Sequence, residues 1–333
     1  MARPEDGADV SAGPAADPPT TVATAVVLVT HDTCDEVLAA LATLPTSVER
    51  IVVDTGSRDG TVAAVRAAEP GVRVIALANT GYARAVNCGL RATSASTIVV
   101  ANADVRFAPG VVEHLTAVLT DDPQLAAVGP RVRYPDGRPQ ASARRRPDVV
   151  TAVVHALLGR LYPANRWTRR YHQLDADPDL PRDADWLSGC ALALRREAVE
   201  QIGGFDPGYF LYVEDVDLAD RLRAAGWRLR YDPAVEVVHR VGASTAPRRG
   251  RALVWHAQSL HRYLVSRLTG PARLLRGVLP VALAGWVAAT WVLERLGPAG
   301  RSSTGERVGR AAPRPPTVRV PGARGTEVSR ART

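Results

Sequence analysis

The sequence contains no lysine, so arginine supplies all 42 of its basic residues against 34 acidic ones, and the formal net charge is +8. The excess is concentrated in residues 144–170 and from Arg240 to the C-terminus. Arginine suits phosphate groups and anionic lipid, although a solvated basic surface with a charged tail explains most of this excess. No aromatic interleaving, helix-turn-helix signature or zinc-finger spacing accompanies the arginines, which argues against nucleic acid as a partner.

Cysteine is scarce as well. Cys34, Cys88 and Cys190 are odd in number, lie far apart and have no spacing typical of a metal site, which favours a reduced, cytosolic setting. The first residues are rich in Ala, Pro and Asp and contain no apolar segment, so we expect a disordered N-terminus over 1–22 and no signal peptide. Residues 297–333 are predicted to form a disordered basic tail.

Two common nucleotide-binding motifs are missing. No G-x-G-x-x-G follows the first predicted strand, and no P-loop G-K-[ST] occurs anywhere in the sequence. The first absence disfavours a nucleotide-binding oxidoreductase, which is one of the alternatives for an α/β chain of this size.

An apolar run long enough to span a bilayer is also missing. Residues 278–293 are apolar but fewer than the roughly 20 residues that a full span needs. Two tryptophans and the flanking Arg273, Arg276 and Arg295 suit a helix that lies in a membrane interface. A helix packed on the protein core is the equal alternative for this segment, which we delimit as 269–296.

Strand-like runs and helical patterns alternate from residue 24 to about residue 120. Strands are predicted at 25–30, 50–54, 72–77 and 97–101, and helices at 33–44, 61–68, 81–92 and 109–120. Repeated strand–helix units imply right-handed crossovers and a parallel sheet. The predicted fold class is therefore α/β, and residues 23–122 form the first half of a domain that ends at residue 268.

The second half, residues 123–268, is less regular. We expect a hairpin over 124–141, a long mobile segment at 144–179 with a short helix at 149–158, and a strand pair or bulged strand at 185–194. Short helices are predicted at 196–202 and 216–225, strands at 227–231 and 235–238, and an amphipathic helix at 252–268.

Polar residues follow the predicted strands at their carboxyl ends, where parallel α/β sheets bind ligands. Asn102 and Asp104 come directly after the buried run 97–101, and a carboxylate there is well placed to hold a divalent cation against a diphosphate. Asp54 ends the second strand and could accept a hydrogen bond from a base or a ribose hydroxyl. An ordinary turn aspartate is the simpler interpretation of either position.

Three further sets of residues carry possible chemistry. The helix that begins at Gly81 could direct its N–H groups and Arg84 at a diphosphate, or could simply be a capped helix. Glu214, Asp215 and Asp217 lie at a predicted helix start, where the helix dipole alone explains them and a general base is the functional alternative. His239 follows a strand and could complete a metal site with Asp104.

Together these patterns resemble the family 2 inverting glycosyltransferases of GT-A fold, over about residues 25–264. The family's strand–Thr–aromatic–Asn appears as Val29–Asp32 with both last positions changed, and its D-N-x-S-x-D-G-T appears as Asp54–Thr61 with Thr55 the departure. The remaining matches are N-x-G-x-x-x-x-x-N at 79–87, D-x-D as 102–104, G-x-x-x-x-x-R-R at 189–196, E-D-x-D-L-x-x-R at 214–221, and His239.

The resemblance implies a GT-A, Rossmann-like, mixed and mainly parallel sheet flanked by helices, with a C-terminal helical extension. Within the family, the chain is most like bacterial rhamnosyltransferases that act on lipid-linked N-acetylglucosamine (GlcNAc) in cell-wall assembly. That likeness implies dTDP-rhamnose as donor, a polyprenyl-diphosphate-linked acceptor, Mn²⁺ or Mg²⁺ as cofactor, and a peripheral position on the inner face of the cell membrane. A nucleotide-sugar-binding protein without catalysis, or a transferase with another sugar donor, remains open because Asn102 replaces an acidic residue.

The same resemblance assigns roles to residues. Asp215 would be the base that deprotonates the acceptor hydroxyl, with Glu214 as the second candidate. The other expected roles are donor binding by Thr30, Asp54, Gly81, Arg84 and Asn102, metal binding by Asp104 and His239, and acceptor binding by Trp186 and Asp217.

Overall fold

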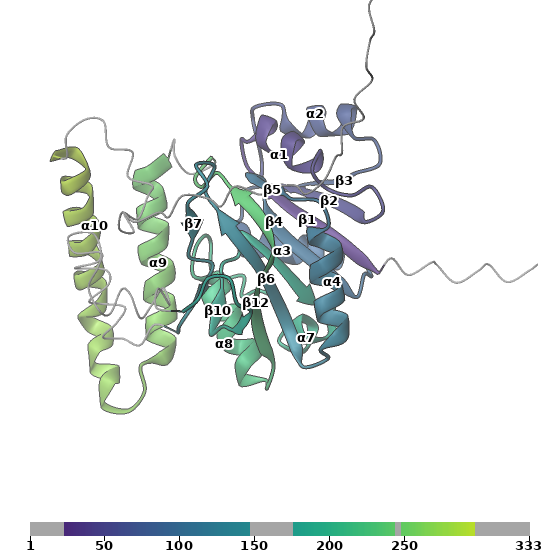
Figure 1. Cartoon of the computed structure of the whole chain (residues 1–333). Helices are drawn as coiled ribbons and strands as arrows, with labels where there is room; N and C mark the ends of the chain where they lie inside the picture. Colours follow the sequence, from purple (N-terminus) through teal and green to yellow (C-terminus); the bar gives the residue numbers. More distant parts are fainter. Residues whose placement is uncertain (1–22, 147–175, 244–247, 297–333) are drawn as a thin grey trace, which may run out of the picture.

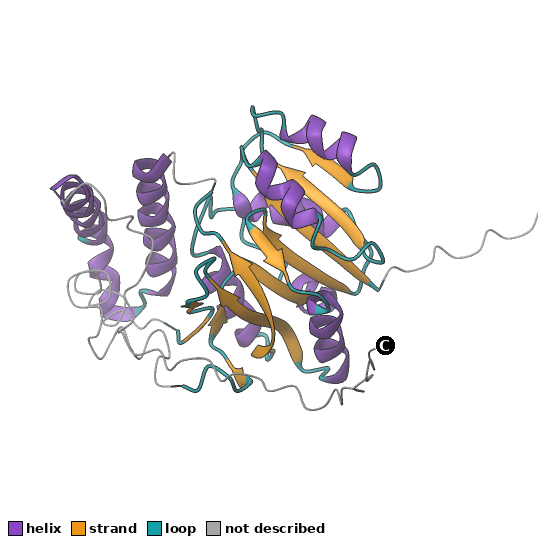
Figure 2. Ribbon diagram, turned by 45° about the horizontal axis from the view of Figure 1, so that its top comes forward, coloured by secondary structure: helices purple, strands orange, loops and turns teal. Residues whose placement is uncertain are grey.

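The computed structural model describes residues 23–146, 176–243 and 248–296. The predicted disorder of 1–22 and 297–333, and nearly all of the mobile segment at 144–179 with its short helix, lie outside the described residues. The described part consists of a mixed sheet with helices on both faces and a pair of helices that stands beside it (Figures 1 and 2).

The first half contains the predicted strand–helix units. These are β1 (Thr24–Thr30), α1 (Cys34–Leu41), β2 (Glu49–Asp54), α2 (Thr61–Ala68), β3 (Arg73–Ala76), α3 (Tyr82–Arg91), β4 (Thr97–Asn102) and α4 (Val111–Asp121). Strands β3, β2, β1 and β4 are parallel neighbours in that order. The sequence prediction is confirmed here because every residue of β1 is buried, as expected for a parallel strand that is covered on both faces.

The second half makes the sheet mixed. Its elements are β6 (Leu125–Arg133), β7 (Pro139–Gln140), β8 (Ala143–Arg144), β9 (Arg182–Asp183), β10 (Trp186–Leu187), β11 (Ala191–Arg195), α7 (Arg196–Gln201), α8 (Glu214–Ala224) and β12 (Arg228–His239). Strand β11 pairs antiparallel with both β4 and β6 and so joins the two halves. The predicted hairpin is confirmed as the antiparallel pair of β6 and β7.

The prediction of two strands at 227–231 and 235–238 is wrong. A single strand, β12, covers the whole region, with a register shift between Asp232 and Glu236. Pro233 lies at this irregularity, where a proline is tolerated in a strand, and the Asp232 side chain accepts a hydrogen bond from the N–H of Ala234 across it. The sequence analysis also missed β5 (Val105–Phe107), which pairs with the end of β12.

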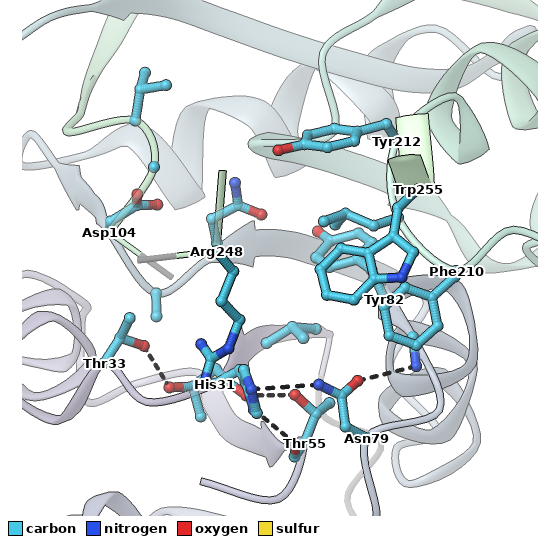
Figure 3. Close-up of a pocket in the computed structure, with 18 of the residues that line it drawn as sticks. His31, Thr33, Thr55, Asn79, Tyr82, Asp104, Phe210, Tyr212, Arg248 and Trp255 are labelled. Atoms are coloured by element: carbon cyan, nitrogen blue, oxygen red, sulfur yellow. Dashed lines mark hydrogen bonds between the residues drawn. The ribbon is translucent and has the colours of Figure 1, made fainter. Parts of the chain in front are cut away.

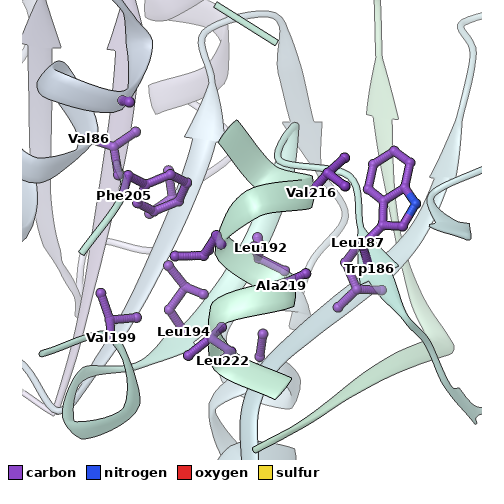
Figure 4. Packing of buried hydrophobic residues seen from close by; sticks show 14 of the residues in the cluster. Val86, Trp186, Leu187, Leu192, Leu194, Val199, Phe205, Val216, Ala219 and Leu222 are labelled. Atoms are coloured by element: carbon purple, nitrogen blue, oxygen red, sulfur yellow. The ribbon is translucent and has the colours of Figure 1, made fainter. Parts of the chain in front are cut away.

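Two apolar layers cover the sheet, and their members alternate along the strands. Val26 and Leu28 of β1 face α1 and α4, while Val27 and Val29 face α3 and α8. Around α8 the buried side chains interdigitate with those of β10, β11 and α7 (Figure 4). The alternation fixes the strand register, so the polar carboxyl ends of β1, β2 and β4 meet at one edge.

The C-terminal part consists of α9 (Arg249–Arg267), the 3₁₀ segment η2 (Gly270–Gly277) and α10 (Leu279–Leu296). Helix α10 packs against α9, and its surface residues Val281, Trp291 and Val292 are exposed. Within the described residues, no single helix is long and apolar enough to cross a membrane, although η2 and residues 279–292, bent by 51°, pass the same test as a pair.

Candidate active site

A cleft of about 950 Å³, counting its open mouth, lies at the carboxyl ends of β1 and β4. Strand, loop and helix residues from both halves line it. Figure 3 shows Asp104 on one side, Tyr82, Phe210 and Trp255 on the other, and Arg248 between them. The described lining residues are Val29, Thr30, His31, Thr33, Thr55, Asn79, Gly81, Tyr82, Asn102, Ala103, Asp104, Phe210, Leu211, Tyr212, His239, Val241, Gly242, Arg248 and Trp255.

Asp104 and His239 are brought together by the pairing of β5 with β12, in which His239 lies opposite Val105. The Nε2 atom of His239 is 3.2 Å from Oδ1 of Asp104 and 3.4 Å from the side-chain amide of Asn102. Both Asp104 and His239 are buried. Burial would lower the pKa of His239, but the Cys190 sulfur and the Asp104 carboxylate outweigh it and raise that pKa to about 10.

The donor set of this pair fits a divalent metal. The Nδ1 atom of His239 lies 3.1 Å from Oε1 of Gln140, and this contact leaves Nε2 as the nitrogen that faces Asp104. Ligands in adjacent positions of an octahedron with bonds of about 2.1 Å lie roughly 3 Å apart, as these two atoms do. Among the described residues no group of three or more His, Cys, Asp or Glu side chains is arranged to hold a metal ion, so waters and substrate phosphates would supply the other ligands.

The end of β1 supplies another part of the wall. Thr30 is buried, and its hydroxyl is hydrogen-bonded to that of Thr33 at 2.8 Å. His31 contacts the carbonyl of Thr55 through Nδ1 at 2.8 Å and the Asn79 amide through Nε2 at 3.3 Å. The end of β1 is therefore bonded to the turn at Thr55 and to the loop at Asn79, which the sequence showed only as separate motifs.

Asp54 is buried at the end of β2 beside this wall, although it does not line the cleft itself. Its Oδ2 accepts hydrogen bonds from the N–H groups of Gly56 and Ser57, as a turn aspartate does. Its Oδ1 is buried and has no hydrogen-bond partner in the protein. An unpaired buried carboxylate oxygen is costly, so Oδ1 remains available to a ligand N–H or hydroxyl.

Gly81 precedes α3 and has a φ of +98°. A Cβ at this position would lie 2.6 Å from the carbonyl oxygen of Phe210, which accepts a hydrogen bond from the N–H of Tyr82 at 2.7 Å. This close approach places the loop that contains Phe210, which leads into α8, against the start of α3. Arg84, one turn further on, is exposed and does not line the cleft.

We expect Gly81→Ala to destabilise the protein by more than the cost of a left-handed backbone alone, which is about 1–3 kcal/mol. Gly60→Ala is the matched control, because Gly60 has a φ of +84° and open space around its Cβ position. Urea unfolding of both variants measures the difference. Equal losses of stability would show that Phe210 moves aside without cost.

The acidic cluster begins α8. Tyr212 and Val213 both have a φ of +68°, and two successive non-glycine residues in this region are strained. The turn positions Glu214 and Asp215 in the first turn of the helix. Oδ2 of Asp215 accepts a hydrogen bond from the N–H of Gly189 at 2.9 Å, whereas Oε2 of Glu214 is buried without a hydrogen-bond partner.

A short chain of hydrogen bonds links this cluster to the cleft. The hydroxyl of Tyr82, a lining residue, donates to the carbonyl of Gly189 at 3.2 Å, and the N–H of Gly189 donates to Asp215. The carbonyl of the next residue, Cys190, accepts from the N–H of Asn102. Tyr82 and Asn102 of the first half therefore hold the segment around Gly189 in place, and that segment in turn orients Asp215 of the second half.

Burial raises the pKa of both carboxyl groups. For Glu214 the Asp215 charge adds to burial, and the pKa reaches about 8. For Asp215 burial is opposed by hydrogen bonds from the N–H groups of Gly189 and Val216 and by Arg144. The hydrogen bonds and Arg144 thus favour the charged form at Asp215 over the charged form at Glu214.

Two predicted acceptor residues lie elsewhere in the structure. Trp186 is buried in the core, its ring lies under the Arg144 guanidinium, and its Nε1 donates to the carbonyl of Arg145. Asp217 is buried and accepts a hydrogen bond from Nε of Arg221 at 2.7 Å. Neither residue lines the cleft.

The sequence analysis missed part of the cleft wall. The ring centres of Trp255 and Phe210 lie 4.7 Å apart. Arg248 forms an ion pair with Asp32, and the Asp32 carboxylate accepts hydrogen bonds from the Arg248 guanidinium and from the N–H of Arg58. Both residues come from the region of α9, far along the chain from the motifs. The aromatic residues beside the acidic cluster were a usable signal for Phe210, but no local pattern identifies the α9 residues.

Comparison with known proteins agrees with this geometry. The sequence profile of glycosyl transferase family 2 matches residues 26–203, more than half of the chain, and the profile described as the N-terminal domain of galactosyltransferase matches residues 169–242. The chain is 39% identical to the N-acetylglucosaminyl-diphospho-decaprenol L-rhamnosyltransferase of Mycobacterium tuberculosis over 261 residues, which cover 74% of this chain and 85% of that protein.

Two further similarities are more limited. The rhamnosyltransferase WbbL of Escherichia coli K12 is 39% identical over 83 residues, or 25% of this chain and 31% of that protein. A solved structure of the mannosyltransferase PcManGT from Pyrobaculum calidifontis, in complex with GDP-Man and Mn²⁺, has a TM-score of 0.49 and 21% identity, with 85% of this chain and 78% of that chain covered.

A mixed sheet with a cleft at its carboxyl edge, lined by paired metal-type ligands and flanked by a buried acidic pair, is the arrangement of a nucleotide-sugar transferase. The chain belongs to glycosyl transferase family 2, and it is a glycosyltransferase. The family, the mainly parallel sheet with flanking helices and the helical extension predicted from the sequence are confirmed.

Proposed function

We propose that this enzyme transfers L-rhamnose from dTDP-rhamnose to N-acetylglucosamine carried on a polyprenyl diphosphate. The support for this specificity is the 39% identity with the mycobacterial rhamnosyltransferase, whose name states that acceptor, over 85% of its length. The cleft supports the same class of donor, since it combines buried polar groups with a pair of metal-type ligands.

In this proposal the donor lies along the carboxyl edge of the sheet. Thr30 and Asp54 contact its base and ribose. The start of α3 faces its diphosphate with the N–H groups that follow Tyr82, whose own N–H donates to Phe210. Asp104 and His239 hold Mn²⁺ or Mg²⁺, with the Asn102 amide beside them. A divalent ion bound there supplies positive charge that neutralises the leaving diphosphate. Arg248, which lines the cleft, is better placed than the exposed Arg84 to add positive charge.

The transfer is a single displacement with inversion. The acceptor hydroxyl oxygen forms a bond to the anomeric carbon while the bond from that carbon to the diphosphate breaks. Asp215 takes the hydroxyl proton, and its two N–H donors orient the carboxylate and oppose the effect of burial on its pKa. Glu214 stays protonated at neutral pH because burial and the Asp215 charge raise its pKa.

A turnover assay separates this function from binding without catalysis. The enzyme, dTDP-rhamnose, Mn²⁺ and a GlcNAc-diphosphate-lipid acceptor are expected to release dTDP and rhamnosylated lipid, and EDTA in excess stops the reaction. Release of neither product, with donor binding intact by calorimetry, would identify a nucleotide-sugar-binding protein. Transfer from another nucleotide sugar alone would correct the donor.

We also propose that the enzyme is attached peripherally to the inner face of the cell membrane. The supporting observation is an exposed apolar surface on η2 and the start of α10, where Leu274 is 85% exposed and Val281 is 73% exposed, flanked by Arg273 and Arg276. Apolar residues beside arginines suit an anionic lipid surface. The three cysteines are free, as a reduced compartment requires.

Replacing this surface should release the protein from lipid. For the double variant Leu274→Ser and Val281→Ser we expect the affinity for vesicles of anionic lipid, measured by co-sedimentation, to fall by roughly a hundredfold or more, the scale of two buried apolar side chains. The control is Leu180→Ser, which changes a 58% exposed leucine on the sheet domain. Equal partitioning of wild type and double variant would contradict the attachment.

A further inference from the structure

An apolar groove separate from the cleft runs between α9 and α10. It encloses about 1270 Å³, counting its open side, and most of its walls are aliphatic or aromatic. The helix pair stands beside the sheet in both ribbon views (Figures 1 and 2), so the groove lies outside the two core layers. Its lining residues are Val254, Ala257, Gln258, His261, Pro280, Leu283, Ala284, Val287, Ala288, Trp291 and Val292.

Helix α9 is a wall of both the cleft and the groove. Trp255 lines the cleft, while its neighbour Val254 and the residue Ala257 line the groove. The residue between Trp255 and Ala257 is His256. The centre of its ring lies 5.3 Å from the ring centre of Tyr212 in the cleft and 5.7 Å from that of Trp286 on α10. The two cavities are therefore adjacent, with one helix and an aromatic contact as the partition.

The aromatic contact in this partition carries no charge. Burial lowers the pKa of His256 to about 4, so its imidazole is neutral at physiological pH. A cation is available at the cleft end of α9, where the Arg251 guanidinium lies 5.2 Å from the centre of the Trp255 ring. The α10 residues that line the groove lie between Pro280 and Val292, which span roughly 18 Å at 1.5 Å per residue.

The cleft, the Arg251 guanidinium and the groove follow one another along α9. They match, in the same order, the parts of a ligand that has a polar reacting end, a diphosphate and a long apolar chain. We propose that the groove between α9 and α10 binds the isoprenoid tail of the lipid-linked acceptor while its sugar reacts in the cleft. This inference rests on the proposed function for the nature of the acceptor. The groove proposal specifies where the tail lies, and in it α9 is the helix that separates the tail from the sugar.

The groove also differs from the proposed membrane surface. Val281, which is exposed and belongs to that surface, does not line the groove, whereas Ala284 and Ala288 do. A bulky residue at Ala284 fills the groove. The same substitution at Ala289, an exposed position of α10 that does not line the groove, is the matched control.

The test compares acceptors that differ only in tail length. Full-length enzyme in detergent is assayed with GlcNAc diphosphates that carry a short or a long isoprenoid chain. For Ala284→Phe we expect the KM for the long-tailed acceptor to rise about tenfold, the scale of one lost apolar contact area, with the short-tailed acceptor unchanged. Ala289→Phe should behave as wild type. Unchanged discrimination in Ala284→Phe, or an equal loss in both variants, overturns the proposal.

A binding measurement keeps this test independent of the reaction. Trp291 lines the groove, so titration of the wild type with a long-chain polyprenyl phosphate should change its fluorescence, and Trp291→Phe should lose most of that change. Binding without any rhamnosyl transfer would refute the proposed function and leave the groove assignment standing. No fluorescence change, or a dimer by light scattering that Ala284→Phe dissociates, would refute the groove assignment.

Discussion

Asp215→Asn is expected to lower kcat by roughly 10²-fold or more, the scale of a lost general base. The amide is nearly isosteric with the carboxylate, and its oxygen can still accept the hydrogen bond that the N–H of Gly189 donates, so that only the bond from the adjacent N–H of Val216 is lost. The fold and the affinity for the donor should therefore be kept. The measurement is kcat with dTDP-rhamnose and a short-chain lipid-linked GlcNAc, together with donor affinity by calorimetry.

Glu214→Gln is the matched control for this prediction. Burial keeps Glu214 largely protonated at neutral pH, and its Oε2 has no hydrogen-bond partner, so its loss should cost less activity. If Glu214→Gln is inactive and Asp215→Asn turns over near the wild-type rate, the base has been assigned to the wrong carboxylate. If both variants stay active, the pair only begins α8 and the base lies elsewhere.

Asp104→Ala is expected to abolish transfer together with the metal-dependent part of donor binding. The variant removes the only carboxylate among the described residues that line the cleft, and it leaves His239 without the oxygen 3.2 Å from its Nε2 atom. A single neutral imidazole cannot hold a hard divalent cation against a diphosphate with comparable affinity. Calorimetric titration with dTDP and UDP sugars, with and without Mn²⁺, measures the effect.

Asp136→Ala serves as the control, because Asp136 is an exposed aspartate in the turn between β6 and β7. It should leave both transfer and metal-dependent binding at wild-type levels. Metal-dependent donor affinity that survives in Asp104→Ala would contradict the assignment of Asp104 as a metal ligand.

The sequence by itself determined the first half of the sheet and the residues that end its strands. Continuous apolar runs occur in β1, β2 and β4, and an apolar strand buried on both faces has few alternatives to a parallel sheet. The order of motifs also identified the family, because each one combines a strand end with a polar residue that the chemistry of sugar transfer uses.

The tertiary structure decided which of those polar residues meet. Asp104 and His239 are 135 positions apart in the sequence, and only the pairing of β5 with β12 brings them to 3.2 Å. Strand β5 has three residues, too few to show a period, so the sequence could not predict the pairing. Donor binding by Arg84 and acceptor binding by Trp186 were expected from the sequence, but Arg84 is exposed on α3 and Trp186 belongs to the core.

The aromatic wall and the groove depend on packing alone. Trp255 reaches the cleft because α9 packs beside the loop that contains Phe210 and Tyr212. The local sequence of an amphipathic helix does not indicate which part of the protein it packs against. Periodicity tells which face of a helix is apolar, whereas only the assembled structure tells what that face touches. The sequence therefore determined the chemistry available to this protein, and the tertiary structure decided where that chemistry is assembled.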